Sequence, residues 1–272
     1  MPARPKLGQN FLVDAQAVER IAAALGDLSG RTVVEIGPGR GAITAAFAAR
    51  AGHVLAIELD RELAAHLRNR FSPDRVTVVE QDVLKFDFAK APAHLPASFS
   101  RAAGRLRVAG NLPYYITSPI LLKLAASHAA LDLAVLMVQR EVADRIVAAP
   151  GSRDYGLLSV TAQMYGPAET LFTLPPSAFS PPPEVHSTVF RWRFAPRFAP
   201  LGVDEAGFLR FLRQAFAQKR KTLANNLRAA GLSPASISPA LHRAGIGSQA
   251  RAESLPVEAL AALWHELQQE GG

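Results

Sequence analysis

The stretch RTVVEIGPGRG, residues 31–41, decides the fold of this chain. Its first half is an apolar run of the kind that forms a strand covered on both faces of a sheet. Glycines follow at positions 37, 39 and 41, where the strand is predicted to turn into a helix over residues 42–50. Glycine permits a tight turn and lets backbone N–H groups approach a ligand. Such loops occur in every doubly wound fold, so this one indicates the architecture and leaves the ligand open.

Strand and helix patterns alternate from residue 31 to residue 140. Runs rich in Val, Ile and Leu predict strands over residues 31–37, 53–60, 75–82, 105–111 and 132–139. Helical composition between them predicts helices over residues 42–50, 61–70 and 117–127. This repetition is typical of an α/β fold with a doubly wound parallel sheet.

The pattern continues differently beyond residue 140. Two helices are predicted over residues 141–149 and about 155–165. The run VHSTVFRWRF, residues 185–194, predicts an antiparallel hairpin strand that closes the sheet. After the linker at residues 195–202, apolar residues recur at helical spacing in short amphipathic pieces. We therefore predict two domains, a sheet domain over residues 1–198 and a small helical domain over residues 199–272.

The composition excludes several classes of protein. The chain has 272 residues, is 49% hydrophobic and contains no cysteine, which removes disulfides and thiolate chemistry. Seven scattered histidines show no metal-ligand spacing, so we expect no metal site. No apolar stretch approaches the length of a membrane helix, and the first residues lack the apolar core of a secretion signal. We expect a soluble, cytoplasmic protein that does not contact a membrane.

The basic residues are concentrated in the last third of the chain. The formal net charge is +7, and residues 206–252 contain eight Lys and Arg but no Asp or Glu. A long basic run without acids favours contact with nucleic acid over a merely solvated helix face. The candidate phosphate contacts are Arg213, Lys219, Arg220 and Lys221.

Carboxylates follow the strands after the glycine loop. Glu58 ends the second predicted strand, where it can accept hydrogen bonds from both hydroxyls of a ribose. Asp82 ends the third, where it can accept from the exocyclic amine of an adenine. Together with Gly37 and Gly39 they predict a nucleoside site that suits a dinucleotide or S-adenosylmethionine. A Walker lysine is absent, which disfavours an ATP site.

The fourth predicted strand ends in Asn111-Leu112-Pro113-Tyr114. The N6 nitrogen of adenine is a poor nucleophile because its lone pair is delocalised into the ring. The Asn111 oxygen and a backbone carbonyl held by Pro113 can accept its hydrogens, and Tyr114 can stack on an extruded base. The tetrapeptide therefore favours a methyltransferase that acts on an exocyclic amine. The alternative is a strand-terminating turn with a buried tyrosine.

Motifs along the whole chain resemble those of one family, the KsgA/RsmA ribosomal RNA adenine dimethyltransferases. They are KLGQNFL (6–12), EIGPGRGAIT (35–44), AIELD (56–60), EQDVLKFD (80–87), VAGNLPYYITSPI (108–120), QREVADRI (139–146), AAPGSRDYG (148–156), AFSPPPEVHSTV (178–189) and AFAQKRKTLANNL (215–227). The resemblance implies a Rossmann-like S-adenosylmethionine-dependent methyltransferase fold with a small C-terminal helical domain.

The resemblance also implies roles for single residues. The residues expected to bind S-adenosylmethionine are Asn10, Leu12, Gly37, Gly39, Glu58, Asp82, Val83 and Asn111. The catalytic segment is Asn111, Leu112, Pro113 and Tyr114, and Phe179 matches an aromatic that holds the target base against Tyr114. For Phe179 the alternative is a core aromatic in a proline-rich loop.

The implied reaction is transfer of two methyl groups to N6 of each of two adjacent adenines. These adenines lie in the hairpin loop near the 3′ end of 16S small-subunit ribosomal RNA. The expected partners are this RNA and the pre-30S ribosomal subunit, with the enzyme acting as a monomer in small-subunit biogenesis. The residues alone reach only an amine methyltransferase that acts on nucleic acid.

Three other functions compete with this one. An enzyme of the erythromycin-resistance type, which methylates an adenine of large-subunit RNA, would share the fold. A non-catalytic RNA-binding assembly or transcription factor would keep the fold without the chemistry, and a checkpoint role in ribosome assembly is compatible with retained catalysis. A nicotinamide oxidoreductase would use a similar nucleoside site. The segments NLPYYITSPI and QKRKTLANNL disfavour the first, and the intact set of predicted cofactor residues disfavours the second.

Overall fold

The computed structural model describes residues 10–100 and 104–269. Within these residues the chain forms two compact units. The first holds the residues up to Ala143 together with Glu169–Phe194, and the second holds Asp144–Ala168 together with the residues from Ala195 onward. Residues 144–168 thus group with the helices at the end of the chain. These compact units are groups of residues in mutual contact and do not follow the boundary at residue 198. The domains expected over residues 1–198 and 199–272 stay a prediction.

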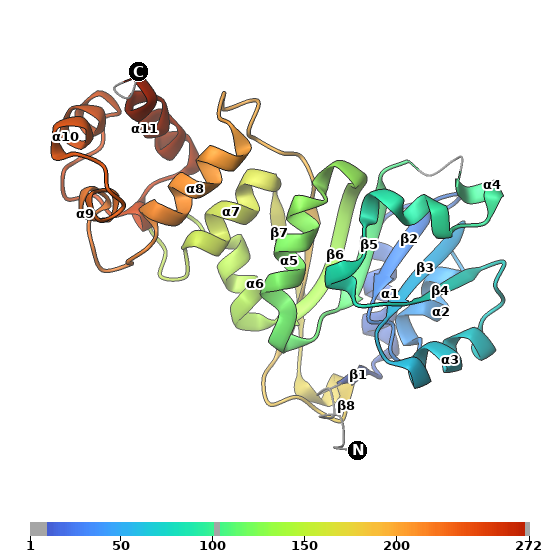
Figure 1. Ribbon diagram of the computed structural model, residues 1–272. Helices are drawn as coiled ribbons and strands as arrows, with labels where there is room; N and C mark the ends of the chain where they lie inside the picture. Colours follow the sequence, from blue (N-terminus) through green and yellow to red (C-terminus); the bar gives the residue numbers. More distant parts are fainter. Residues whose placement is uncertain (1–9, 101–103, 270–272) are drawn as a thin grey trace, which may run out of the picture. The chain divides into compact units, whose positions relative to one another are not determined.

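A seven-stranded sheet in the order β4-β3-β2-β5-β6-β9-β7 is the centre of the first unit (Figure 1). Strands β2 to β6 are parallel, and β9 runs antiparallel to β6. The doubly wound parallel sheet predicted from the alternating pattern is therefore confirmed. The strands are β2 (Thr32–Ile36), β3 (His53–Glu58), β4 (Val76–Glu80), β5 (Leu106–Asn111), β6 (Leu131–Gln139), β7 (Ala168–Leu174) and β9 (Ser187–Arg193). The strand order reverses between β2 and β5, which is where open α/β sheets bind ligands.

Within the described residues of the first unit, five α-helices surround the sheet or follow its strands. They are α1 (Ala15–Ala24), α2 (Ala42–Ala48), α3 (Arg61–Arg70), α4 (Ala97–Ser100) and α5 (Thr117–Ala126). Asp14 caps α1 by accepting a hydrogen bond from the Ala17 N–H group, and Asp60 caps α3 in the same way. Ile21 of α1 and Phe47 of α2 are buried in one apolar cluster with residues of β2, β3 and β5. This packing anchors the glycine loop, because α2 begins directly after Gly41.

The edge of the sheet differs from the expectation. The strand predicted over residues 185–194 is present as β9 and is antiparallel, but β7 lies outside it and forms the edge. The prediction that residues 185–194 close the sheet is therefore wrong. No continuous apolar run marks β7, because six of its seven residues are partly buried or exposed, as in an edge strand.

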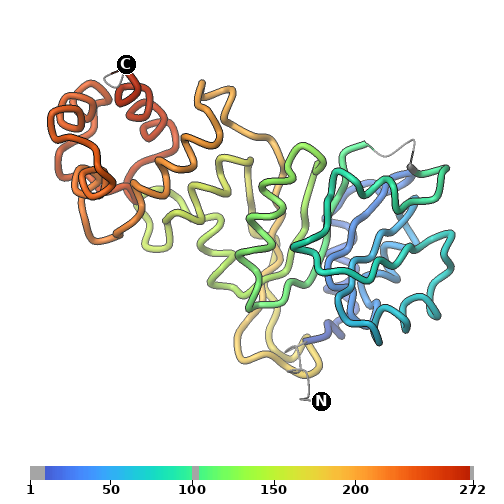
Figure 2. The backbone as a smooth tube through the Cα atoms, in the orientation of Figure 1, coloured from blue at the N-terminus to red at the C-terminus, as the bar shows by residue number. Residues whose placement is uncertain are grey.

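Two segments far apart in the sequence form a second, two-stranded sheet. Strand β1 (Phe11–Leu12) pairs antiparallel with β8 (Phe179–Ser180), and Leu12 stands opposite Phe179. The tube in Figure 2 shows β1, near the start of the described residues, beside this later loop. The pairing brings the end of the motif KLGQNFL to the proline-rich motif. The part of KLGQNFL before Asn10 lies outside the described residues.

The second unit is helical. Its elements include α7 (Leu157–Tyr165), α8 (Glu205–Ala215), α9 (Leu223–Ala229), α10 (Pro234–Arg243) and α11 (Val257–Gln269), while α6 (Arg140–Val147) spans the boundary between the units. The rings of Phe208 and Phe211 on α8 pack against Trp264 of α11, with centroids 6.1 and 5.6 Å from the indole. The helical C-terminal region predicted from the periodicity is confirmed. Over residues 10–100 and 104–269, no helix has the length and apolar character needed to cross a bilayer.

Candidate active site

One cavity of about 320 Å³ lies at the carboxyl ends of β2, β3, β4 and β5. It is bordered by the start of the described chain, the glycine loop and the Asn111-Leu112-Pro113-Tyr114 segment. The predicted site residues that line it are Asn10, Leu12, Gly37, Gly39, Glu58, Asp82, Val83, Asn111, Leu112, Pro113 and Tyr114. The structure thus brings together every predicted cofactor residue and the whole tetrapeptide. Phe179 does not line this cavity.

The glycine loop, residues 37–41, has a backbone conformation that residues with a Cβ atom adopt only with strain. Gly37 and Gly39 have φ angles of +64° and +57°, in the left-handed region that favours glycine. A Cβ atom on Gly39 would lie 2.9 Å from the Phe11 ring. Glycine at position 39 is therefore required by the approach of β1 as well as by the turn itself.

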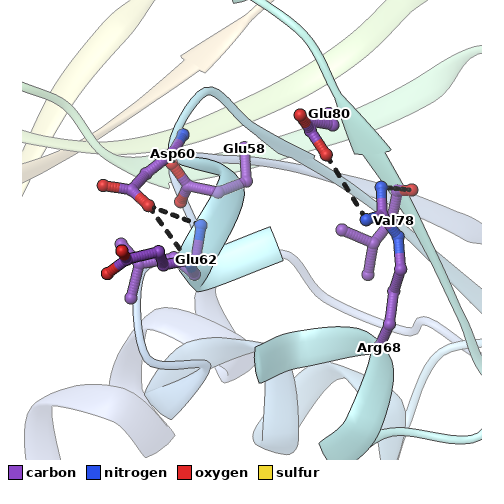
Figure 3. A network of polar contacts seen from close by, with 7 residues as sticks. Glu58, Asp60, Glu62, Arg68, Val78 and Glu80 are labelled. Carbon is purple, nitrogen blue, oxygen red and sulfur yellow. Dashed lines mark hydrogen bonds and ion pairs between the residues drawn. The ribbon is translucent and has the colours of Figure 1, made fainter. Parts of the chain in front are cut away.

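Glu58 presents its carboxylate at the end of β3. Its Oε2 atom accepts a hydrogen bond of 3.1 Å from the Gly39 N–H group, and its Oε1 atom accepts one of 2.9 Å from the Asp60 N–H group. Burial raises the pKa of Glu58 above its ordinary value, while these N–H groups act in the opposite direction. Figure 3 shows Glu58 beside Asp60, which caps α3 through the N–H groups of residues 62 and 63. Each carboxylate oxygen keeps a lone pair for a further donor in the cavity.

Asp82 lies one strand further along the sheet. Its Oδ1 atom accepts a hydrogen bond of 2.9 Å from the Leu84 N–H group, which fixes the carboxylate at the start of a short 3₁₀ turn, η1 (Val83–Lys85). The second oxygen is then free to accept from an amine. The phenol of Tyr115 lies close enough for the charge of Asp82 to add to burial in raising the pKa of Tyr115.

The orientation of the Asn111 amide is set by the start of the described chain. Its Nδ2 atom donates a hydrogen bond of 2.9 Å to the Asn10 carbonyl oxygen. Only the nitrogen of an amide can donate to a carbonyl, so this contact distinguishes the Nδ2 atom of Asn111 from its Oδ1 atom. The Oδ1 atom is thereby left as an acceptor at the cavity.

The rest of the tetrapeptide is held by its neighbours. The Pro113 carbonyl accepts hydrogen bonds from the Ile116 N–H group and the Thr117 hydroxyl, at 3.2 and 3.1 Å. The Tyr114 hydroxyl is hydrogen-bonded to the Ser187 hydroxyl at 2.6 Å. Leu112 is buried and its N–H group donates to the Met137 carbonyl. The backbone therefore enters the cavity as a rigid turn.

Phe179 is buried, with 3% of its surface exposed. It packs in the apolar cluster that contains Leu12, Leu174 and Ala178. In this conformation the ring serves as a core aromatic beside the cavity wall. Its contact with a target base stays a prediction.

Some cavity residues had not been predicted from the sequence. Val13, Leu59 and Tyr115 line the cavity although 60%, 51% and 60% of their surfaces are exposed, and they form an apolar rim. Large exposed apolar side chains often mark a binding surface. The sequence position of Leu59 could have marked it as a site residue, since it directly follows Glu58 at the end of a strand. Glu35, inside β2, also lines the cavity and carried no such signal.

The predicted phosphate contacts lie in the second unit. Arg213 is in the last turn of α8, and Lys219, Arg220 and Lys221 are exposed in the loop before α9. The Lys219 ammonium donates a hydrogen bond of 2.6 Å to the Arg153 carbonyl, so this lysine also fastens the loop to residues 149–156. No ion pair involves Arg220 or Lys221 among the described residues. Over residues 10–100 and 104–269, no group of three or more His, Asp or Glu side chains is arranged to hold a metal.

Two solved structures share this architecture. The 23S ribosomal RNA methyltransferase ErmE matches with a TM-score of 0.71 at 25% identity, over 96% of this chain and 100% of that one. A dimethyladenosine transferase from Plasmodium falciparum matches with a TM-score of 0.76 at 22% identity, over 96% and 98%. The fold is therefore that of a Rossmann-like methyltransferase with a C-terminal helical region.

The sequence comparisons define the family. The family model described as ribosomal RNA adenine dimethylase matches residues 2–269. Two proteins named ribosomal RNA small subunit methyltransferase A are similar over 97% of this chain. The one from Acidobacterium capsulatum is 58% identical over 91% of its own length, and the one from Koribacter versatilis is 52% identical over 94%. The chain belongs to the ribosomal RNA adenine dimethylase family, and it is an enzyme of that class.

Proposed function

We propose that this enzyme uses S-adenosylmethionine to dimethylate N6 of two adjacent adenines in the 3′-terminal hairpin loop of 16S ribosomal RNA. The substrate is the pre-30S subunit in the cytoplasm, and the enzyme acts as a monomer. The observation that carries the proposal is the orientation of Asn111, whose Nδ2 atom is used by the Asn10 carbonyl and whose Oδ1 atom is available at the cavity. An acceptor oriented in this way is what an exocyclic amine needs.

The cavity fits S-adenosylmethionine in several ways. The glycine loop approaches without Cβ atoms, and Glu58 and Asp82 present acceptors on neighbouring strands. We assign the ribose hydroxyls to Glu58 and the adenine amine to Asp82. Val83 and Leu12 supply apolar contacts, and Asn10 closes the cavity through its bond to Asn111.

The chemistry follows from the tetrapeptide. When bound, the cofactor supplies a methyl group on a positively charged sulfur, so that the carbon–sulfur bond breaks as the carbon–nitrogen bond forms. The Asn111 oxygen and the Leu112 carbonyl accept the N6 hydrogens, which returns the lone pair to nitrogen. The Pro113 carbonyl already accepts two hydrogen bonds, which leaves Leu112 as the second acceptor. Tyr114 stacks on the extruded base.

A second methyl transfer needs no additional base. After the first transfer the amine keeps one hydrogen, and one of the two acceptors is sufficient to hold it. The nitrogen is positively charged immediately after each transfer and is then strongly acidic, so its proton passes to solvent. A site made of a side-chain amide and a carbonyl tolerates both substrates.

The proposed function is tested by methyl transfer from labelled S-adenosylmethionine to purified ribosomal subunits. We expect label on small subunits that lack the modification and none on large subunits. Label on large subunits instead would favour an enzyme of the erythromycin-resistance type. Cofactor binding without transfer to either subunit would favour a non-catalytic assembly factor, and binding of NAD in place of S-adenosylmethionine would favour an oxidoreductase.

Glu58→Ala is expected to weaken S-adenosylmethionine binding by about 10- to 100-fold. A hydrogen bond to a charged group is worth roughly 1.5–3 kcal/mol, and each 1.4 kcal/mol is about tenfold in affinity. Calorimetric titration measures the change, and RNA binding should stay nearly intact. The control Glu62→Ala removes an exposed carboxylate from the same turn. Unchanged affinity in Glu58→Ala would remove this residue from the cofactor site.

Replacing Lys219, Arg220 and Lys221 with Gln should flatten the salt dependence of RNA binding. Each phosphate contact contributes about 0.7–0.9 to the slope of log affinity against log salt, so the triple variant should lose roughly two units. The apparent KM for ribosomal substrate should rise while cofactor affinity stays constant. Lys90→Gln, an exposed cation of the first unit, serves as the control. Parallel lines for wild type and triple variant would show that the run is only a solvated surface.

A further inference from the structure

Glu35 is a buried carboxyl group that the proposed chemistry does not use. It lies within β2, only 1% of its surface is exposed, and it lines the cavity. Among the described residues its Oε2 atom has no hydrogen-bond partner, and the nearby Thr44 hydroxyl is the one side-chain group that acts on the carboxyl as a hydrogen-bonding neighbour. A buried polar atom without a partner costs free energy, so such an atom at a binding cavity points to a missing ligand.

The sheet register places Glu35 within an ordered series of polar groups. Glu35 is paired with Ala56 of β3 and Ala109 of β5. Because side chains alternate along a strand, Glu35, Glu58 and Asn111 lie on the same face of the sheet. Along the strand order β4-β3-β2-β5, the cavity therefore offers Asp82, Glu58, Glu35 and Asn111 in turn.

The series assigns Glu35 to one part of the cofactor, and this step rests on the proposed function. The adenine and ribose belong to Asp82 and Glu58, and the transferred methyl group must face Asn111. The sulfonium joins the ribose to the transferred methyl group, and the amino-acid chain branches from it. We therefore assign the methionine part to β2, the strand between β3 and β5. That part carries two cationic groups, the sulfonium and the α-ammonium. Ala56 and Ala109 on either side of Glu35 leave room for a ligand to approach the carboxyl.

The surroundings of Glu35 favour a neutral carboxyl in the free protein. Burial and, to a smaller extent, the charge of Glu58 raise the pKa of Glu35, the Thr44 hydroxyl acts in the opposite direction, and the net pKa is about 8. The titratable and charged groups that face the cavity from the surrounding elements are Arg40, Glu58, Arg70, Asp82, Tyr114 and Tyr115. No ion pair links Glu35 to either arginine among the described residues. A cation in the cavity would stabilise the ionised form instead.

We propose that Glu35 holds a proton in the free protein and releases it when the cationic methionine portion of the cofactor binds. The O–H bond of the carboxyl breaks, the proton passes to the buffer, and the carboxylate becomes the counter-charge of the bound cofactor. Cofactor affinity then rises with pH, because binding and proton release are one linked equilibrium.

Calorimetry of the wild-type protein tests the proposal without any substitution. Titrations with S-adenosylmethionine at about pH 6.5, in buffers with different ionisation enthalpies, count the protons released. At this pH a group with the pKa of Glu35 is almost fully protonated, and the amino group of the ligand is fully charged. We expect close to one proton released per cofactor, and an affinity that rises nearly tenfold per pH unit from about pH 6 to 7.

Glu35→Gln identifies the source of the proton. Glutamine keeps the shape of the neutral carboxyl, so this variant should fold, and thermal unfolding verifies that it does. We expect proton release and the pH dependence of affinity to disappear. Thr44→Val is the matched control, since it removes the neighbouring hydroxyl and should leave proton release in place. Proton release that persists in Glu35→Gln would overturn the proposal and point to Glu58.

S-adenosylhomocysteine separates the two cationic groups, because it keeps the ammonium and lacks the sulfonium. Release with both ligands makes the ammonium the partner of Glu35, and release with S-adenosylmethionine alone makes it the sulfonium. No release with either ligand contradicts the proposal. These binding measurements need no RNA, so the proposal can fail while methyl transfer to the ribosomal subunit is observed.

Discussion

Asn111→Ala is expected to lower the rate of methyl transfer by about 10²–10³, the usual effect of losing one preorganised hydrogen-bond group at a reacting centre. The alanine lacks the oxygen that accepts an N6 hydrogen, so the lone pair stays in the adenine ring. The partly buried amide also loses its bond to the Asn10 carbonyl, which affects folding stability only modestly. Single-turnover transfer at saturating cofactor measures the chemical step separately from cofactor affinity.

The control for this variant is Asn69→Ala, which removes an exposed asparagine on α3. It should transfer methyl groups at the wild-type rate. If Asn111→Ala retains activity within a factor of two of wild type, the side-chain oxygen does not activate the amine. The catalytic acceptors would then have to be backbone carbonyls alone.

Gly110→Ala is expected to lower the free energy of unfolding by about 3 kcal/mol, at the upper end of the usual effect of overpacking. A Cβ atom on Gly110 would lie 2.7 Å from the Ile36 carbonyl oxygen and 3.2 Å from the Ile36 Cβ. These are backbone-proximal atoms of the paired strand β2, so relief requires β2 and β5 to move apart. Asn111 follows directly, and the variant should therefore lose activity as well as stability.

Gly247→Ala provides the comparison for this prediction. A Cβ atom on Gly247 would meet nothing within 4 Å, so the change in stability should stay within about 0.5 kcal/mol. Urea unfolding of both variants measures the difference. Equal stability of Gly110→Ala and Gly247→Ala would show that the two central strands accommodate a side chain at this position.

The central strands could be predicted because burial on both faces leaves a continuous apolar run. Strands β2, β3, β5 and β6 appear in the sequence as near-continuous apolar runs, with polar exceptions such as Glu35 inside β2 and Arg107 inside β5. Edge strand β7 has no such run, and the two-residue strands β1 and β8 are too short for any periodicity. Their pairing depends on contacts between residues more than a hundred positions apart, which a local pattern does not encode.

The site could be predicted where polar residues end apolar strands. Glu58, Asp82 and Asn111 stand at such positions, and the cavity contains all three. Glu35 lies inside its strand instead, where a single acid looks like an interruption of the apolar run. The contact of Phe11 with Gly39 and the cation–π contact of Phe11 with Arg40 arise from β1, so tertiary packing alone reveals them.

Nucleoside analysis of the reaction product tests the central claim most directly. Small subunits that lack the modification are incubated with the enzyme and S-adenosylmethionine, and their 16S RNA is digested to nucleosides. We predict N6,N6-dimethyladenosine at two residues per subunit, located in the 3′-terminal hairpin loop. Monomethyladenosine as the final product, dimethyladenosine elsewhere in the RNA, or no methylated adenine would contradict the account.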